Sequence, residues 1–305
     1  MTQGQFPGVC WQNGKYVPLP EASIPLLDPG FTRGDAVYDT TSVWKGIFFR
    51  IDDHIDRFFR SCAKARLAPP VTKDDIRRIL AECTHQAGLT EAYVQMISTR
   101  GPYASPTNRD PRQCSNTFYA FAMPYIWIVK PERQEEGIDI AIATGNRRTP
   151  PESIDPTMKN FNWLDLTRGL LEGLDRGSDN ALLCTPDGRL SEGAGFNMFI
   201  ITKGTLRTPR GNMLEGITRR TVLELAGELG IPAEETDLYP DDLRGADEAF
   251  LCTTAGGVMP IASVEGADLA HGKGPGPLTM TIRSEYWKRR EAGWHGTSVA
   301  SLLPG

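Results

Sequence analysis

Apolar and polar residues alternate along the first fifty positions in short runs separated by turn signals. The run CWQNGKYVPL predicts a hairpin through Asn13-Gly14, and AVYDTTSVWKGIFFRI predicts two strands joined at Lys45-Gly46. From Asp53 to Leu67 the apolar spacing becomes that of a helix with one buried face. A second helix is expected from Lys73 to Ala87, with Thr72 as its cap. This part of the chain therefore predicts a β-meander followed by two helices.

The rest of the chain continues the mixture of strands and helices. AYVQMISTR and TFYAFAMPYIWIV predict strands on either side of a polar loop from Gly101 to Ser115, a length typical of functional or mobile loops. Proline and charge gather between Pro124 and Gly137, which indicates a linker. Beyond it, DLTRGLLEGLDRG, TRRTVLELAGELGI and the segment Pro277 to Glu291 predict helices among further strands. We predict an α/β protein with an N-terminal domain (1–125), a linker (126–135) and a C-terminal domain (136–305).

Composition narrows the function classes. The 305 residues are 40% hydrophobic and 23% charged, and the formal net charge of -5 leaves no sustained basic surface for a nucleic acid. The N-terminal sequence lacks a secretion signal, and no apolar run approaches the roughly 18 residues of a membrane span. We therefore expect a cytoplasmic protein that binds neither nucleic acid nor membrane. Six cysteines without a CxxC pair and four histidines without HxxxH spacing predict reduced thiols and no metal site.

Two residues have the chemistry that a carbonyl cofactor requires. Lys159, in DPTMKNFNW, follows Met158 near a chain reversal, and a lysine in partly apolar surroundings can act as a nucleophile toward an aldehyde. Glu192, in GRLSEGAGFN, ends a polar strand just before small residues, and a carboxylate can keep a pyridine nitrogen protonated. Taken singly, each is also compatible with a surface lysine or a solvated turn residue.

Two segments present backbone N–H groups in the manner of anion sites. LEGITRRTVLELAGELG places Gly216, Ile217 and Thr218 at the start of a predicted helix, and CTTAGG places Thr254 before two glycines. Helix N-termini and glycine-rich turns bind phosphate well, although each segment alone also fits a plain cap or turn. Arg57, on the predicted helix DDHIDRFFRS, offers a compensating charge.

These pieces occur in an order that resembles the class IV, or fold-type IV, pyridoxal-phosphate (PLP) aminotransferases. Within that family the (R)-selective amine:pyruvate transaminases are most similar. The resemblance extends from about Tyr16 to Met280. It is carried by PLLDPGF, GDAVYDTTSVWKGIFFRIDDHIDRF, PYIWIVKPE, RRTPPESIDPTMKNFNWLDLTRGL, LSEGAGFN, LEGITRR and FLCTTAGGVMPI. It implies the two-domain fold of the D-amino-acid and branched-chain aminotransferases, PLP as cofactor, and a homodimer.

The resemblance also implies residue roles. Lys159 matches the catalytic lysine that holds the cofactor, and Glu192 matches the partner of the pyridine nitrogen. The phosphate group falls to Arg57, Ile217, Thr218 and Thr254. It places Tyr38 and Trp163 at the substrate pocket. We also expect Thr253, Ala255, Arg33 and Arg109 to bind the substrate.

The sequence departs from the amine transaminases at the substrate end. Their loop after TRG carries an arginine for the acceptor's carboxylate, whereas the matching position here falls at or near Pro106. Arg109 or Arg112 is a possible substitute, since a guanidinium binds a carboxylate at two points. Arg33, in GFTRGD, adds a cation that favours carboxylated substrates such as D-amino acids.

The predicted activity is a ping-pong transamination from an (R)-amine or a D-amino acid to a keto acid such as pyruvate. The alternatives on the same fold are a D-amino-acid or a branched-chain transaminase, and a lyase similar to aminodeoxychorismate lyase. YDTTSVW lacks the small-residue and arginine pattern usual in branched-chain enzymes. A non-catalytic phosphate- or vitamin-binding protein would need neither Lys159 nor Glu192.

Overall fold

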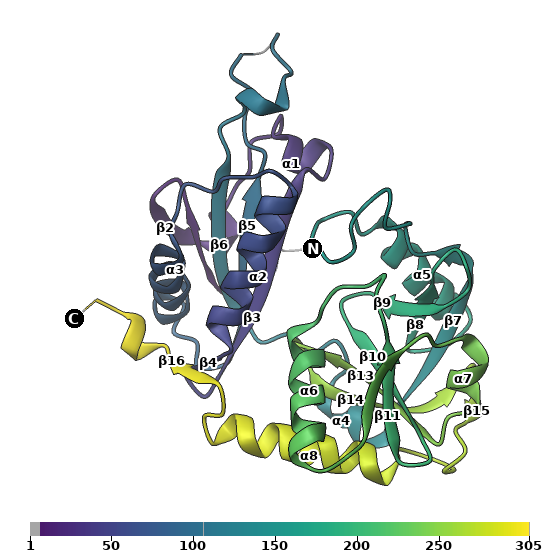
Figure 1. The fold of residues 1–305 in the computed structure, drawn as a ribbon. Coiled ribbons are helices and arrows are strands. Elements are labelled where there is room, and N and C mark those ends of the chain that lie inside the picture. Colours follow the sequence, from purple (N-terminus) through teal and green to yellow (C-terminus); the bar gives the residue numbers. More distant parts are fainter. Residues whose placement is uncertain (1–6, 106, 305) are drawn as a thin grey trace. The chain divides into compact units, whose positions relative to one another are not determined.

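The chain divides into two compact units (Figure 1). A computed structural model describes residues 7–105 and 107–304. The first unit contains Met1–Ile126, Met158–Asn162 and Arg290–Gly305, and the second contains Trp127–Thr157 and Trp163–Arg289. The chain thus returns twice to the first unit, once for a segment of only five residues that includes Lys159.

A seven-stranded antiparallel sheet forms the first unit. Its strands, in sheet order, are β16 (Gly296–Ser298), β4 (Ile47–Phe49), β3 (Ala36–Trp44), β5 (Ala92–Thr99), β6 (Thr117–Pro124), β1 (Val9–Gln12) and β2 (Lys15–Pro18). The hairpins predicted at Asn13-Gly14 and Lys45-Gly46 are confirmed as β1–β2 and β3–β4. The long strand β3 pairs with β5 along eight residues, from Ala36 opposite Thr99 to Val43 opposite Ala92.

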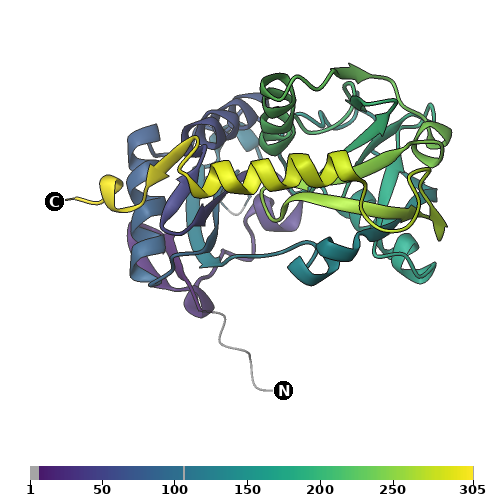
Figure 2. The same cartoon turned by 90° about the horizontal axis from the view of Figure 1, so that it is seen from below.

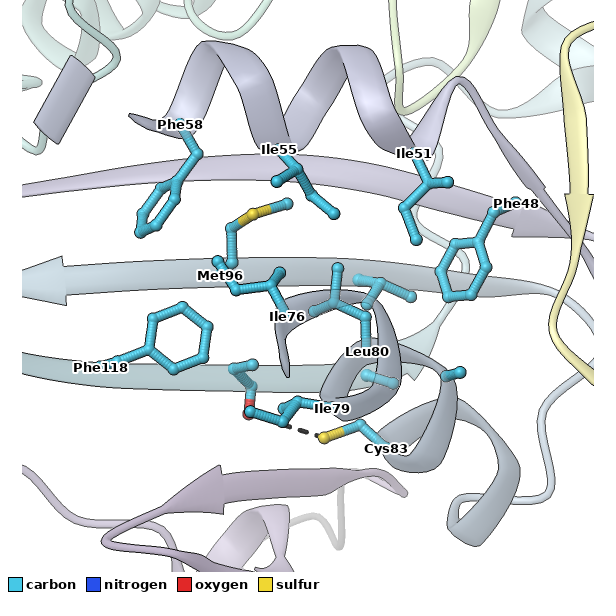
Figure 3. Close-up of a cluster of buried hydrophobic side chains, with 14 of the residues drawn as sticks. Phe48, Ile51, Ile55, Phe58, Ile76, Ile79, Leu80, Cys83, Met96 and Phe118 are labelled. Atoms are coloured by element: carbon cyan, nitrogen blue, oxygen red, sulfur yellow. Dashed lines mark hydrogen bonds between the residues drawn. The ribbon is translucent and has the colours of Figure 1, made fainter. Parts of the chain in front are cut away.

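Two helices cover one face of this sheet, and their packing forms the core of the unit. Helix α2 (Ile51–Lys64) packs on β3, and α3 (Lys73–Gln86) packs on β6, as Figures 1 and 3 show. Phe48, Phe58 and Ile76 are among the fully buried side chains between helices and sheet. Each such side chain contributes about 1.5–3 kcal/mol on burial, so the helices are held against the strands mainly by apolar contact. The remaining short helices are η1 (Leu19–Glu21), α1 (Pro29–Thr32), η2 (Pro111–Gln113) and η3 (Ala300–Leu302).

The second unit contains a nine-stranded mixed sheet. Its main order is β12 (Ala233–Thr236), β11 (Thr205–Pro209), β10 (Asn197–Thr202), β13 (Glu248–Thr253), β14 (Gly257–Val264), β7 (Ile138–Arg147), β8 (Asn180–Cys184) and β9 (Leu190–Gly193), and β15 (Ala267–Asp268) pairs with β14. Strand β7 is parallel to both β8 and β14. Several strands of this sheet, such as β8 and β13, are buried at every position, which explains their nearly continuous apolar sequences.

Five helices accompany this sheet: α4 (Pro131–Glu136), α5 (Leu164–Asp175), α6 (Ile217–Glu228), α7 (Pro240–Arg244) and α8 (Pro277–Glu291). Helix α5 packs on β7 and β8. A Cβ at Gly169 would lie 2.4 Å from Leu183 Cδ1, so glycine permits this close approach. Helix α8, seen lengthwise in Figure 2, is tied to α6 by the ion pair of Arg289 with Glu228. None of the helices in the described ranges is long and apolar enough to cross a membrane.

Candidate active site

Lys159 is held through its backbone on the first unit. Its N–H donates to Ser61 Oγ on α2 at 3.1 Å, and its carbonyl accepts the N–H of Tyr38 on β3 at 3.0 Å. Asn160 forms an isolated bridge with Val37 on the same strand. Both backbone groups of the lysine are therefore fixed by the unit's main helix and its longest strand.

The Lys159 side chain lies over an aromatic ring. Its Nζ is 4.6 Å from the centroid of the Tyr38 ring, and that ring packs against Phe161 at a centroid distance of 4.5 Å. Tyr38 is itself buried. The structure thus brings together two residues that the sequence assigned separately, the cofactor lysine and the substrate tyrosine.

Arg57 is buried on α2 and paired with a carboxylate that the sequence analysis did not single out. Its Nε donates to Asp39 Oδ2 at 2.7 Å, and its Nη2 donates to Asp39 Oδ1 at 2.9 Å. His54, one turn earlier on α2, places Nδ1 2.8 Å from the same Oδ1. Two features of the sequence could have indicated this pair: Asp39 is a charged residue within a buried strand, and the sequence DDHIDR on the following helix contains the histidine and the arginine that contact it.

The charges in this cluster are strongly perturbed by burial. Burial alone would raise the pKa of Asp39, but the Arg57 charge and the hydrogen bonds from Arg57 and His54 outweigh it and hold that pKa far below its usual range. Burial lowers the pKa of His54 despite its contact with Asp39. His54 is therefore neutral near pH 7, and the cluster of one arginine and one aspartate carries no net charge.

Glu192 occupies a buried position on β9 in the second unit. Arg148 Nη2 donates to Glu192 Oε1 at 3.0 Å, and the N–H of Leu214 lies 3.2 Å from both carboxylate oxygens. The other arm of Arg148 bonds Asp165 Oδ2 at 2.5 Å. Arg148 was missed in the sequence analysis; its only signal was the position of RRTPPES in one of the family-like blocks.

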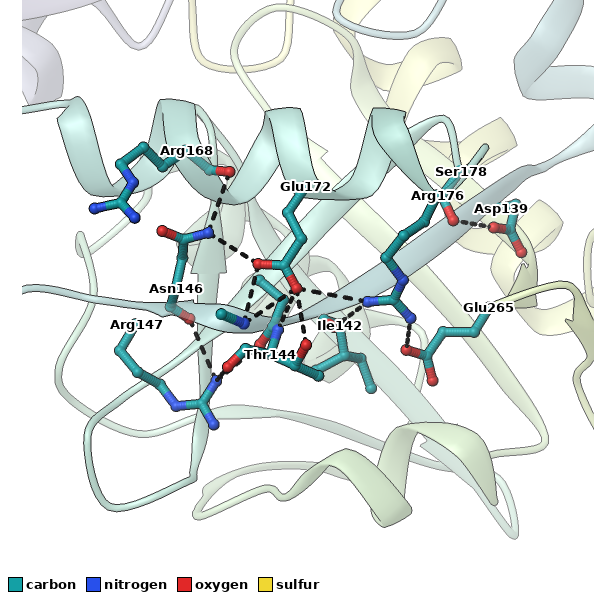
Figure 4. Close-up of polar contacts among 12 residues, drawn as sticks. Asp139, Ile142, Thr144, Asn146, Arg147, Arg168, Glu172, Arg176, Ser178 and Glu265 are labelled. Atoms are coloured by element: carbon teal, nitrogen blue, oxygen red, sulfur yellow. Dashed lines mark hydrogen bonds and ion pairs between the residues drawn. The ribbon is translucent and has the colours of Figure 1, made fainter.

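The residues before Arg148 are anchored by a second carboxylate network, drawn in Figure 4. Glu172 on α5 accepts hydrogen bonds from the backbone N–H groups of Thr144 and Gly145 and from Asn146 Nδ2. Burial would raise the pKa of Glu172, but these hydrogen bonds lower it to about 2. The end of β7 is thereby fastened to α5 just before the chain reaches Arg148.

The predicted phosphate-binding residues of the second unit lie in two places. Helix α6 begins at Ile217 after the N-cap Gly216, which provides no side-chain cap. The first N–H groups of a helix have no partner within the helix, so those of Ile217 and Thr218 suit an anion. A Cβ at position 216 would clash with Asn197 Oδ1, so glycine permits the close approach of Asn197 to this turn. Thr254 lies in the turn between β13 and β14.

Three further substrate candidates belong to the second unit, and two of them, Thr253 and Ala255, flank Thr254. Thr253 Oγ1 donates to Gly195 O at 2.7 Å, and the N–H of Ala255 lies 3.4 Å from Thr253 Oγ1. Trp163 is the N-cap of α5 and packs against the small apolar cluster of Ala143, Leu166 and Leu183. These residues are placed on ordered elements, and their contact with substrate stays a prediction.

The arginine candidates for a substrate carboxylate differ in their engagement. Pro106 lies outside the described residues. Arg112 is paired with Asp110, whereas Arg109 is exposed and makes no ion pair within the described residues. Arg33 is exposed, with its guanidinium carbon 5.9 Å from the Tyr103 ring centroid. Of the two loop arginines, Arg109 is thus the one whose charge is not already balanced by a neighbouring carboxylate.

The sheet face that carries Tyr38 also carries polar residues that the sequence analysis missed. Thr40 lies two residues after Tyr38 and pairs with Gln95 on β5, and its hydroxyl is 3.3 Å from that of Tyr93. Gln95 is 8% exposed, and its side-chain amide, which is not sealed from solvent, has no hydrogen-bond partner among the described residues. Its place beside Thr40 makes Gln95 a candidate for contact with a ligand on this face of the sheet.

Each unit contains groups of the kind that PLP requires. The first unit has a lysine beside an aromatic ring and a buried arginine, which suit the aldehyde and the phosphate. The second unit has a buried carboxylate and a helix N-terminus without a side-chain cap, which suit the pyridine nitrogen and the phosphate. Among the described residues, no three His, Cys, Asp or Glu side chains are grouped as metal ligands.

Comparison with known proteins agrees with this reading of the chemistry. The family model for class IV aminotransferases matches residues 36–264. A relative from Methanocaldococcus jannaschii, provisionally named a branched-chain-amino-acid aminotransferase, is 32% identical over 277 residues, covering 90% of this chain and 93% of that protein. The D-alanine aminotransferase of Listeria monocytogenes is 28% identical and covers 90% and 93% of the two chains.

Solved structures give the same result at the level of the fold. The PLP-form of the branched-chain amino acid aminotransferase from Thermobaculum terrenum superposes with a TM-score of 0.83. It is 28% identical in sequence, and the match covers 97% of this chain and 99% of that one. The predicted fold class is confirmed.

Proposed function

The chain belongs to the class IV aminotransferases and is a PLP-dependent aminotransferase, and from this premise we propose its substrates and the roles of its residues. The proposed reaction moves an amino group from an (R)-amine or a D-amino acid to a keto acid such as pyruvate in two ping-pong stages. The observation that carries the residue assignment is the position of Lys159, whose backbone is fixed on both sides and whose amine lies over Tyr38.

Lys159 is the proposed catalytic residue. Bound PLP supplies an aldehyde carbon and an electron-accepting ring. Lys159 would hold the cofactor at rest and, once displaced by the amine donor, carry the proton from the substrate carbon to the cofactor carbon as general base and then acid. The Tyr38 ring limits where the lysine amine can move.

The remaining residues are assigned to binding. Glu192 supplies the negative charge for the pyridine nitrogen, with Arg148 and the Leu214 N–H orienting its carboxylate. The phosphate falls to Arg57, to the N–H groups of Ile217 and Thr218, and to Thr254. Tyr38, Arg33, Arg109, Trp163, Thr253 and Ala255 are assigned to the substrate.

The identity of the amino-group donor rests on fewer observations than the cofactor does. Relatives named as branched-chain and D-alanine aminotransferases keep both alternatives open, and neither is better supported than the (R)-amine. Exposed Arg33 and Arg109 favour an acceptor with a carboxylate. A lyase similar to aminodeoxychorismate lyase is the further alternative.

We also propose a cytoplasmic homodimer. Leu26, Leu27 and Phe31 are 72%, 78% and 61% exposed on one short segment of the first unit. The adjacent Asp28 is fully buried and bonds Gly30 N and Thr99 Oγ1, so this apolar segment is held in place. An exposed apolar patch of this kind is typical of a subunit contact.

The test is a half-reaction scan of the purified PLP-bound protein. (R)- and (S)-1-phenylethylamine, D- and L-alanine and L-leucine are added one at a time, and the visible absorbance of the bound cofactor is followed. Lys159→Ala is the matched control, because it removes the amine but leaves Tyr38 and Ser61 in place.

Fast bleaching by the (R)-amine and by D-alanine supports the proposed donors. Bleaching by L-leucine alone would replace them with branched-chain L-amino acids. Repeated turnover of aminodeoxychorismate to pyruvate with no keto acid present, and with no lasting loss of the cofactor absorbance, would indicate a lyase. Bleaching by Lys159→Ala at the wild-type rate would contradict the role of Lys159.

A further inference from the structure

Asp39 and Arg57 form a fully buried pair that joins β3 to α2. Asp39 is 0% exposed and Arg57 is 4% exposed. Asp39 also accepts the N–H of Thr40 at 2.7 Å and contacts His54 Nδ1 at 2.8 Å. Donors therefore surround the carboxylate on several sides, so neither it nor the guanidinium can rotate without breaking several bonds.

Arg57 contacts Asp39 through one of the two edges of its guanidinium. Nε and Nη2 form the side-on fork and both donate to Asp39, at 2.7 and 2.9 Å. A guanidinium has a second bidentate edge, formed by Nη1 and the other hydrogen of Nη2. This end-on edge faces away from Asp39 and has the spacing of two oxygens of a phosphate.

The pairing also sets the electrostatics of this group. The Asp39 charge cancels the Arg57 charge, and His54 is neutral. A phosphate would therefore meet a cluster with no net charge, in which the Arg57 N–H groups are held in a fixed orientation. The affinity that this cluster contributes depends on the orientation of those N–H groups more than on net charge. Removing Asp39 would leave Arg57 charged but without its anchor.

We propose that Asp39 is a positioning residue for the cofactor: it fixes Arg57 so that its end-on edge binds the phosphate of PLP. This inference rests on the proposed role of Arg57. It makes Asp39 part of cofactor recognition without contact between Asp39 and the cofactor.

A purely structural pair would behave differently, and the chain offers a matched control. In the same unit, Arg100 also binds a carboxylate through the side-on edge of its guanidinium: its Nε and Nη2 each donate to Asp35 at 2.9 Å. Asp35→Asn removes an ion pair of the same geometry without disturbing Arg57. Pyridoxal, which lacks the phosphate, separates loss of phosphate binding from general damage to the site.

The experiment titrates PLP and pyridoxal into apo-protein and follows absorbance and fluorescence. For Asp39→Asn we expect the affinity for PLP to fall about 10- to 100-fold, the loss of one oriented charge-assisted contact. The affinity for pyridoxal should change less than about threefold, and Asp35→Asn should bind both ligands as the wild type does. Because Asp39→Asn removes a buried charge, Asp39→Glu serves as a second variant that keeps the charge but displaces the carboxylate; it should show the same selective loss.

A double substitution tests whether Asp39 acts through Arg57. In an Arg57→Met background, Asp39→Asn should cause no further loss of PLP affinity, since Asp39 acts through Arg57. Equal losses of PLP and pyridoxal, or additive losses in the double variant, would overturn the positioning role but leave the aminotransferase proposal intact. Full PLP affinity in Arg57→Met would remove Arg57 from the phosphate site and overturn both statements about it.

Discussion

In each unit a buried carboxylate is paired with an arginine, and the two pairs differ in their balance of charge. Asp39 faces Arg57 through two bonds and contacts a neutral histidine, so its charge is cancelled. Glu192 receives one arm of Arg148, while the other arm of that arginine holds Asp165. These three groups by themselves, two carboxylates and one guanidinium, sum to a formal charge of -1.

The difference shows how a carboxylate's surroundings decide what it does. A cancelled charge serves to orient its partner, because little attraction is left for anything else. A cluster with surplus negative charge can stabilise a positive group brought to it, such as a protonated pyridine nitrogen. Residue type alone does not distinguish Asp39 from Glu192; the number and sign of the neighbours does.

The largest effect is expected from breaking the neutral pair. Asp39→Asn leaves a buried, charged Arg57 without its partner, which should lower the free energy of unfolding by about 3–5 kcal/mol. Urea unfolding of apo-protein measures this loss. The more exposed pair of Arg100 and Asp35 provides the control, and Asp35→Asn should cost about 1 kcal/mol or less. Equal costs for the two variants would show that burial does not distinguish the pairs.

Next in size is the loss of the surplus charge at Glu192. Glu192→Gln keeps the shape and a hydrogen-bond acceptor but removes the negative charge, so the donor half-reaction should slow by about 100-fold or more. Stopped-flow absorbance measures the rate on protein saturated with PLP, so that any loss of cofactor affinity in the variant does not contribute to the result. A half-reaction at the wild-type rate would mean that the charge of this cluster is not used.

A smaller effect concerns the support of Arg148, and it depends on pH. The folded-state pKa of Glu172, about 2, lies below its ordinary value of 4.5, so the ionised form is favoured by folding. Its stabilisation is complete above the ordinary pKa and is lost as pH falls through the folded-state value. Glu172→Gln should therefore lower stability by about 1–3 kcal/mol at pH 7 and by little at pH 2.

Thermal unfolding at the two pH values measures the Glu172 effect. Glu285, partly exposed on α8 and paired with Lys288 and Arg289, is the control carboxylate, and Glu285→Gln should change stability by less than about 1 kcal/mol at either pH. A constant deficit for Glu172→Gln at both pH values would contradict the linkage.

The smallest expected effect is at Gln95. Gln95→Met replaces the amide by an apolar side chain of similar length, and because the amide is not sealed from solvent, the stability of apo-protein should change by about 1 kcal/mol or less. If Gln95 contacts substrate, the same variant raises KM for amino or keto acids. Thermal unfolding and steady-state rates give both readouts; a destabilised variant with unchanged KM would assign Gln95 a structural role.

Much of the fold was predictable because local signals agreed with the tertiary structure. Thr72 caps α3 through a capping box with Asp75, and α8 has the predicted bounds, Pro277 to Glu291. Helix α2 begins at Ile51, two residues before the predicted start, because Arg50 occupies a left-handed N-cap that has no sequence signature. The return of Met158–Asn162 to the first unit has no local signal at all, since it depends on backbone bonds to Ser61 and Tyr38.

Candidate site residues could be proposed from the sequence where the proposed role depends on the residue's own chemistry. Lys159, Glu192 and Arg57 were proposed through family-like blocks and distinctive functional groups. Asp39, Arg148 and Gln95 were missed, because their importance comes from partners 18, 44 and 55 positions away along the chain. A single sequence does not show such pairings, whereas the structure gives them as distances.

The path of the chain also bears on how the protein is made. Strand β4 pairs on one side with β3 and on the other with β16, and β16 is synthesised after every residue of the second unit. While the chain is still emerging from the ribosome, β4 is an open edge that another chain can join. The first unit thus cannot be completed before the second has been translated, and the interval between them is when a chaperone would be of most use.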